Sequence, residues 1–192
     1  MSNTGIHTIL RSPQSVFTFT ELALLLGISH ENTLAAKIHY YVKTGALYAI
    51  RKGLYAKDKN YHSFELAIRI YTPAYISFET VLAQEGVIFQ AYQPIFVASY
   101  LTRELKCDEK KIAFKKIKSS VLTNNSGVYR RDYYFMADKE RAFLDTIYLH
   151  KDYYFDHLNR IDWDKCFERI HLYENKKMEK RLNKYYRENK NA

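Results

Sequence analysis

The most restrictive feature of the sequence is a closely spaced set of helix start and stop signals between residues 18 and 29. Thr18 and Glu21 have the spacing of a capping box, in which each side chain accepts a hydrogen bond from the backbone N–H of the other residue. Gly27 can adopt the left-handed conformation that ends a helix, and Ser29 can cap a second helix. The spacing therefore predicts a helix-turn-helix.

The second helix of this pair is expected to be amphipathic. Leu34, Ile38, Tyr41 and Val42 recur at helical spacing and predict one buried stripe. The opposite face then carries Asn32, Thr33, Ala36, Lys37, Tyr40 and Lys43. Short side chains near the start of a recognition helix can reach base edges, and later lysines can meet phosphates. We expect these six residues to bind DNA.

A β-hairpin with a basic turn is expected directly after the second helix. Two apolar stretches, residues 46–50 and 54–56, flank Arg51, Lys52 and Gly53. Glycine permits a tight reversal, and the two cations can meet the DNA backbone or the minor groove. Residues 1–57 are thus predicted to form a winged helix-turn-helix domain.

The charge balance favours a polyanionic partner. The 192 residues carry a formal net charge of +9, and the first 57 residues hold six basic and two acidic side chains. Such an excess is typical of proteins that bind nucleic acids. Winged helices also serve as protein-interaction modules, and a face that bears lysines is often only solvated. An adaptor that does not bind DNA is therefore the alternative.

The rest of the chain is expected to form a mixed α/β domain over residues 64–192, after a polar connection at residues 57–63. The overall class is therefore α+β. The predicted elements are helices at residues 64–70 and after a Ser77 N-cap, strands at residues 95–98, 112–117 and 128–135, and a helix capped by Asp138. Arg141 and Asp145 lie four residues apart and are expected to pair on the surface of that last helix.

Three segments together resemble a known protein family. They are RKGLY at residues 51–55, YISFETVL at residues 75–82 and ADKERAFLD at residues 137–145. In this arrangement the chain resembles the AbiEi-like antitoxins of type IV toxin–antitoxin systems, although members commonly carry Pro-Glu-Lys where this chain has DKE at residues 138–140. The resemblance implies a DNA-binding repressor of its own promoter, acting at repeated half-sites, and a second domain that counteracts a nucleotidyltransferase toxin.

A basic segment at residues 174–190 predicts a further helix. Read as a helix, its sequence places Lys177, Lys180, Arg181 and Lys184 on a shared face. This face is a candidate for contact with the toxin, and a solvated terminal helix is the alternative.

Motifs of catalysis and metal binding are missing from the sequence. Asp138, Glu140, Asp145 and the seven histidines show no ligand spacing, and there is no phosphate-binding loop or nucleophile elbow. Cys107 and Cys166 are far apart and are expected to be ordinary thiols. We therefore expect a non-enzyme without a cofactor or metal. The sequence has neither a signal peptide pattern nor an apolar run that could span a membrane, and we expect a cytoplasmic protein.

Overall fold

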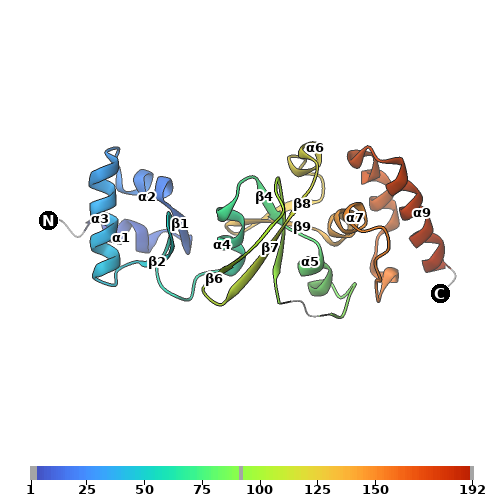
Figure 1. Cartoon of the computed structure of the whole chain (residues 1–192), viewed down its shortest axis with the longest axis horizontal. Helices are drawn as coiled ribbons and strands as arrows, with labels where there is room; N and C mark the ends of the chain where they lie inside the picture. Colours follow the sequence, from blue (N-terminus) through green and yellow to red (C-terminus); the bar gives the residue numbers. More distant parts are fainter. Residues whose placement is uncertain (1–3, 91–92, 191–192) are drawn as a thin grey trace. The chain divides into compact units, whose positions relative to one another are not determined.

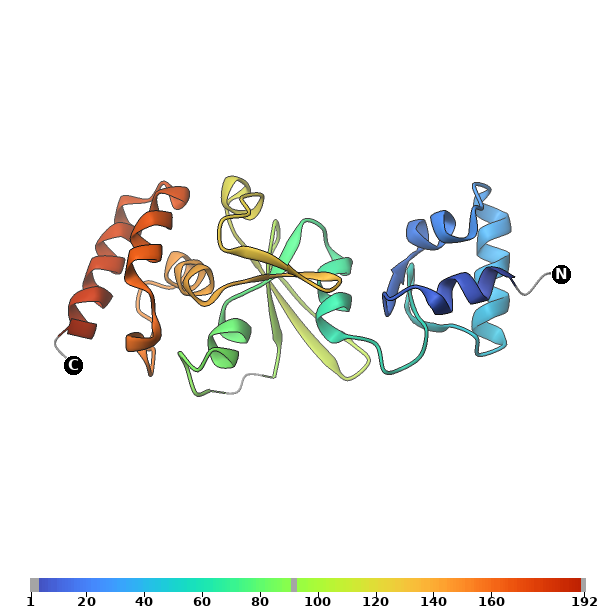
Figure 2. The ribbon, with the colours of Figure 1, turned by 180° about the vertical axis from the view of Figure 1, so that it is seen from behind.

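The computed structural model describes residues 4–90 and 93–190, and the chain divides into two compact units. Unit 1 extends to Ile70, and unit 2 begins at Tyr71. Both units contain helices and strands, as Figures 1 and 2 show from opposite sides. The expected mixed α+β class is confirmed.

Unit 1 combines helices with a small antiparallel sheet. In chain order its elements are α1 (Thr4–Arg11), β1 (Val16–Thr18), α2 (Phe19–Leu26), α3 (Glu31–Lys43), β2 (Tyr48–Arg51), β3 (Leu54–Ala56) and α4 (Ser63–Ile70). The sheet order is β1-β3-β2, so β3 lies in the middle. The hairpin of β2 and β3 was expected from the sequence. Strand β1, which completes the sheet, was not.

The helix signals around the turn are confirmed with one exception. The Thr18 side chain accepts from the Glu21 N–H at 3.2 Å, and the Glu21 carboxylate accepts from the Thr18 N–H at 2.8 Å. Gly27 adopts a left-handed conformation, with φ of 63°. The expected cap at Ser29 is wrong, because α3 begins at Glu31 and its N-cap is His30, which makes no side-chain capping bond. Ser29 therefore precedes the N-cap position of α3 by one residue.

The core of unit 1 gathers apolar side chains from the three N-terminal helices and the sheet. Its fully buried members include Ile9, Phe17 and Leu22. From α3 it receives Leu34 and Ile38, each at most 2% exposed. The predicted apolar stripe of α3 thus packs into the core of unit 1.

Ionic contacts attach α4 to unit 1. The Glu65 carboxylate is buried and accepts from the Ser15 backbone N–H at 3.0 Å and from its hydroxyl at 2.6 Å. Arg69 forms ion pairs with Glu65 and with Glu21 of the capping box. These carboxylates hold α4 against β1 and α2. The predicted connection at residues 57–63 therefore lies inside unit 1, and the division of the chain follows α4.

Unit 2 is built on a mixed six-stranded sheet with the order β6-β7-β5-β4-β9-β8. The strands are β4 (Ala74–Ile76), β5 (Ile95–Ser99), β6 (Arg103–Cys107), β7 (Lys110–Lys116), β8 (Val128–Arg131) and β9 (Tyr134–Ala137). The pairs β5–β7 and β4–β9 are parallel, and the other pairs are antiparallel. The central strands β4 and β5 carry mostly buried side chains. A strand with both faces covered is typical of such a layered sheet.

The helices of unit 2 pack beside the sheet in two layers. They are α5 (Glu79–Gln84), α6 (Ser119–Leu122), α7 (Lys139–Leu149), α8 (Trp163–Arg169) and α9 (Lys176–Lys190), with short 3-10 turns η1 (Leu158–Arg160) and η2 (Ile170–Tyr173). In Figures 1 and 2, α7 lies between the sheet and the pair formed by α8 and α9. Asp138 caps α7 as expected, because its side chain accepts from the Arg141 N–H at 2.8 Å.

Two local predictions for unit 2 are wrong. The single strand expected at residues 128–135 is a hairpin of β8 and β9, because Asp132 takes a left-handed conformation, with φ of 45°, and reverses the chain. Ser77 is not an N-cap, since α5 is preceded by Phe78 without a side-chain capping bond. The Ser77 hydroxyl instead donates to a carboxylate far along the chain.

The capping box generates a prediction about local stability. In Thr18→Ala the side-chain acceptor for the Glu21 N–H is lost, which should weaken the start of α2 by about 1 kcal/mol. Hydrogen exchange of the full chain should then show α2 amides exchanging about fivefold faster. Thr20→Ala is the matched control, because Thr20 is exposed and lies inside the helix. Equal acceleration in both variants would contradict the capping role.

Candidate nucleic-acid interface

Most of the residues that we predicted to bind DNA lie together on the exposed face of α3. The buried stripe of Leu34, Ile38 and Tyr41 turns one side of the helix inward. The exposed positions are Glu31, Asn32, Thr33, Ala35, Ala36, His39, Tyr40 and Lys43. Five of the six residues predicted on α3 are therefore exposed together. Tyr40, with 61% of its surface exposed, presents a large ring on this face.

The structure adds His39 to this face. At 100° per residue, His39 lies only about 20° from Asn32 around the helix axis, on the side away from Lys43, and its side chain is exposed. An imidazole can donate or accept a hydrogen bond, so it suits a base edge or a phosphate. The spacing of seven residues from Asn32 was the sequence signal that could have identified it.

Lys37 differs from the other five predicted residues of α3. Its side chain is half-buried, and its ammonium lies 3.1 Å from the place where a Cβ of Gly5 would stand. Lys37 thus leans toward α1 at the border of the exposed face. It can reach a phosphate only by turning away from α1.

Arg51 and Lys52 are exposed at the turn between β2 and β3. Gly53 completes this turn with φ of 81°, a conformation that favours glycine. The Gly53 carbonyl also accepts from the Phe19 N–H at 3.1 Å, which attaches the turn to the start of α2. Within residues 4–90 and 93–190, neither cation forms an ion pair. Both are therefore available to an anionic partner.

The basic face of α9 is less available than its sequence suggests. The Arg181 guanidinium is half-buried and donates to the Ile147 carbonyl at 2.6 Å, at the end of α7. Lys184 pairs with Asp152 at 3.3 Å. Lys177 and Lys180 are exposed. Three of the four predicted residues therefore face solvent, and of these Lys184 already pairs with Asp152, whereas Arg181 is bound to the end of α7.

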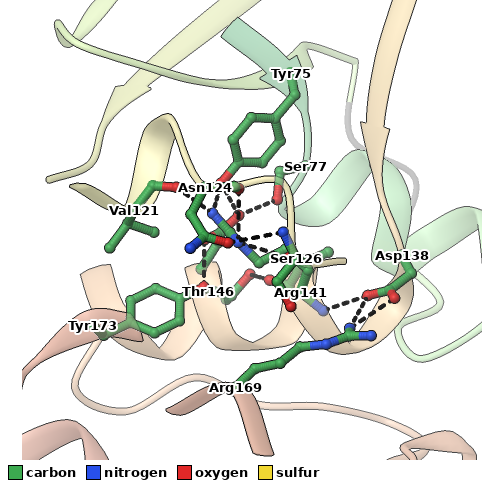
Figure 3. Close-up of polar contacts among 12 residues, drawn as sticks. Tyr75, Ser77, Val121, Asn124, Ser126, Asp138, Arg141, Thr146, Arg169 and Tyr173 are labelled. Carbon is green, nitrogen blue, oxygen red and sulfur yellow. Dashed lines mark hydrogen bonds and ion pairs between the residues drawn. The ribbon is translucent and has the colours of Figure 1, made fainter. Parts of the chain in front are cut away.

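A buried ionic cluster occupies the centre of unit 2 (Figure 3). The Arg141 side chain is completely buried and donates from Nε to the Asp145 carboxylate at 3.3 Å. Its other nitrogens donate to the Ser126 carbonyl at 2.8 Å, the Val121 carbonyl at 2.6 Å and the Tyr75 hydroxyl at 2.8 Å. The expected surface pair is therefore wrong, because α7 lies between two layers and buries this side of the helix.

The Asp145 carboxylate completes the cluster. One oxygen accepts from the hydroxyls of Tyr75 at 2.9 Å and Ser77 at 2.7 Å. The other accepts from the Tyr173 hydroxyl at 2.6 Å and from Arg141. The cluster thereby connects β4, α7 and η2. A buried charge is tolerated when it is paired and fully hydrogen-bonded, as this carboxylate is.

The electrostatics of the cluster favour protonated tyrosines. Burial, and then the nearby Asp145 carboxylate, raise the pKa of both Tyr75 and Tyr173 well above the usual value. Burial alone would lower the pKa of Arg141, but Asp145 and the two tyrosines raise it. The tyrosines therefore remain hydrogen-bond donors and the guanidinium remains charged. Because Arg141 and Asp145 are fully buried, the cluster serves the packing of unit 2 rather than contact with a substrate.

The other two carboxylates considered from the sequence also serve structural contacts. Asp138 accepts from Arg169 with both oxygens, at 2.9 and 2.7 Å, besides capping α7. Glu140 is buried and accepts from the Asp162 N–H at 3.1 Å.

A second ionic cluster in unit 2, which is only partly buried, was not predicted from the sequence. The Lys115 ammonium lies 2.9 Å from the Glu79 carboxylate and 3.5 Å from His150 Nε2, above the ring of Phe96. Burial, and then the Lys115 charge, lower the pKa of His150. Glu79 and Lys115 are 36 residues apart in the sequence, so no local pattern reveals the contact.

Comparisons with known proteins do not add a family to these observations. No family model matches the sequence, and no curated protein matches it. Among the described residues, no three His, Cys, Asp or Glu side chains gather as ligands of a metal ion would. In the same part of the chain, no helix has both the length and the apolar character needed to cross a membrane.

The buried cluster leads to a prediction about unit 2. Tyr173→Phe removes one donor from the Asp145 carboxylate and should lower the free energy of unfolding by about 1–3 kcal/mol. Trp163 is the single tryptophan and belongs to α8, so its fluorescence in urea reports unit 2. Tyr154→Phe is the control, since Tyr154 is 79% exposed. A Tyr173→Phe midpoint equal to that of the control would show that the bond contributes little.

The raised tyrosine pKa values predict a loss of stability at alkaline pH. An unfolded tyrosine releases its proton at about pH 10, whereas folded Tyr75 and Tyr173 retain theirs. Their contribution is complete below pH 10 and is lost as the pH rises further, because the unfolded state then binds fewer protons. Urea midpoints from Trp163 fluorescence should fall between pH 9 and pH 11, and should fall less steeply in Tyr173→Phe. Parallel pH profiles of the two proteins would contradict this assignment.

Proposed function

We propose that unit 1 is a winged helix-turn-helix that binds double-stranded DNA. The order α1-β1-α2-α3-β2-β3, with a turn closed by Gly27 and a three-stranded sheet, supports this interpretation. In such a fold the second helix of the pair lies in the major groove. Here that helix is α3, and the β2–β3 turn is the wing.

The observation that carries this proposal is the exposed face of α3. It has short side chains at its start and a cation at its end, and it is opposite the core stripe. We assign base readout to Asn32, Thr33 and Ala36, with His39 as an additional candidate. Phosphate contacts are assigned to Lys37, Tyr40, Lys43, Arg51 and Lys52. Backbone contacts of this kind fix the orientation of the protein, while the base contacts give the specificity.

We further propose that the chain is an AbiEi-like antitoxin that represses its own promoter and counteracts a nucleotidyltransferase toxin. The support comes from the two segments of unit 2 that resemble this family. Tyr75 and Ser77 of one segment are bonded to Arg141 and Asp145 of the other. The similarity thus falls on residues that hold the unit together. For direct contact with a toxin, α9 offers the exposed Lys177 and Lys180.

The decisive experiment is fluorescence anisotropy of the full chain with the DNA upstream of its own gene. A scrambled duplex of equal length is the control, and both are titrated over a series of salt concentrations. A preference of about a thousandfold for the upstream DNA would establish specific recognition. Equal binding to both duplexes that disappears with salt would refute the repressor and favour the protein-interaction module.

Two substitutions on α3 should separate the assigned roles. Lys43→Ala should weaken binding to all duplexes and reduce the salt slope by about one unit. Thr33→Ala should instead change the preference at one base pair, by about 1–3 kcal/mol. Lys106→Ala, which removes an exposed lysine from β6, is the matched control and should leave binding unchanged. A uniform loss in both α3 variants would contradict the division between base and phosphate contacts.

A further inference from the structure

Strand β6 forms one edge of the six-stranded sheet, and the outer side of its backbone is open. A two-residue turn connects it to its neighbour β7, and Cys107 pairs with Lys110 across this turn. These two residues exchange both backbone bonds, as alternate pairs of the ladder do. Glu104 and Lys106 belong to the other pairs, so their N–H and C=O groups point away from the sheet. In the part of the chain that the structure describes, the backbone of neither residue bonds to another segment.

The opposite edge of the sheet, at β8, is partly occupied. The Val128 N–H donates to the Asn125 carbonyl at 2.9 Å, in the turn that leads into this strand. Over the described residues, the backbone of β6 has no comparable contact outside its ladder with β7, so β6 is the more open edge. An open edge can accept a further strand.

Side chains of opposite charge stand at the two outward positions of β6. Glu104 and Lys106 are both exposed, and they lie on the same face of the sheet because they are two residues apart. On β7 they face Ala113 and Lys111, so neither meets an opposite charge there. Within the described residues Glu104 forms no ion pair, and Lys106 pairs only with Glu109, whose side chain is 94% exposed. An exposed pair of this kind contributes little and is easily exchanged for another.

A second copy of β6 that runs antiparallel to the first matches both the backbone and the charges. Only outward residues can bond, so Glu104 and Lys106 must each face an outward residue of the second copy. Pairing Glu104 with Lys106 of the second copy engages both outward residues of each strand. Pairing either residue with its own counterpart engages only one of them and brings like charges together. The register with the most backbone bonds is therefore the one that places opposite charges directly opposite each other.

We propose that β6 pairs with β6 of a second copy of this chain, which forms a symmetric dimer with one continuous sheet. Each Glu104–Lys106 pair exchanges both of its backbone bonds and joins two opposite charges. A shallow pocket of about 250 Å³ adjoins the same edge, lined in part by Pro94, Leu105 and Ile112. The added strand covers some of this apolar surface, because Leu105 then faces its counterpart at the symmetry axis. The inference uses residues of unit 2 alone and does not rest on the proposed function of unit 1.

The charges on β6 also exclude other strands. Charged side chains on a sheet edge normally prevent pairing with unrelated strands. On β6 they match when the strand meets its own copy, so the same charges select that partner. A short edge buries less surface than a standard interface, and we expect a weak, reversible dimer. At the low protein concentrations of a DNA titration the chain is then monomeric, and Lys106→Ala remains a neutral control for duplex binding.

The test is sedimentation velocity of the full chain over a concentration series that reaches about 100 μM, as a weak interface requires. Glu104→Lys leaves only cations at the outward positions, and Lys106→Glu leaves only carboxylates. Each variant alone should weaken self-association at least about tenfold, because symmetry makes one substitution act at both pairs. An equimolar mixture of the two variants should associate again, since a cationic edge then meets an acidic one.

Glu168→Lys is the matched control, because it makes the same charge change at an exposed position of α8. It should leave self-association unchanged. Hydrogen exchange of the unaltered protein provides a second readout that does not depend on how a variant folds. The Glu104 and Lys106 amides should exchange more slowly in concentrated than in dilute samples, whereas the Leu105 amide, which bonds to β7, should not change.

Four outcomes would overturn the proposal. The full chain could remain monomeric throughout the series, or the mixture of Glu104→Lys and Lys106→Glu could fail to associate. Equal weakening in Glu168→Lys would identify a general effect of charge. A dimer in which the Glu104 and Lys106 amides gain no protection would have its interface elsewhere.

Discussion

The ion pair between Arg141 and Asp145 is the contact on which the organisation of unit 2 depends. Both side chains belong to α7, yet their partners come from β4, from η2 and from the turn after α6. Removing one member of a buried pair leaves the other charge without compensation and typically costs about 3–5 kcal/mol. The pair therefore fixes where α7 lies on the sheet, and α8 and α9 pack on α7 in turn.

The parts of the structure that depend on neighbouring residues could be predicted from the sequence. The capping box at Thr18, the left-handed Gly27 and the Asp138 cap are all confirmed, because each requires residues only a few positions apart. The buried stripe of α3 follows from the same short spacing. The exposed face of α3 was predictable for that reason, since it is the complement of the stripe.

Contacts between distant residues account for the failures. Serine is a residue type that favours the N-cap position, but the Ser77 hydroxyl donates a hydrogen bond to Asp145, which lies 68 residues away in the sequence. The sequence predicts α4 as the start of the second domain, but its Glu65 carboxylate accepts a hydrogen bond from the Ser15 hydroxyl, and α4 belongs to unit 1. Arg141 and Asp145 have the spacing of an ion pair on a helix surface. They are buried because α7 lies between the sheet and the pair formed by α8 and α9. A local pattern contains no information about what packs against it.

A single carboxylate in unit 1 makes two distant helices interdependent. Glu21 accepts from the Thr18 N–H with one oxygen and pairs with Arg69 through the other. We therefore expect the start of α2 and the body of α4 to unfold together as one cooperative unit. Any change that orders α2 and α3 should consequently extend to α4, and fluctuations of α4 should reach the turn between α2 and α3. Through Glu21, α4 is in this sense part of the same unit as the pair of helices α2 and α3.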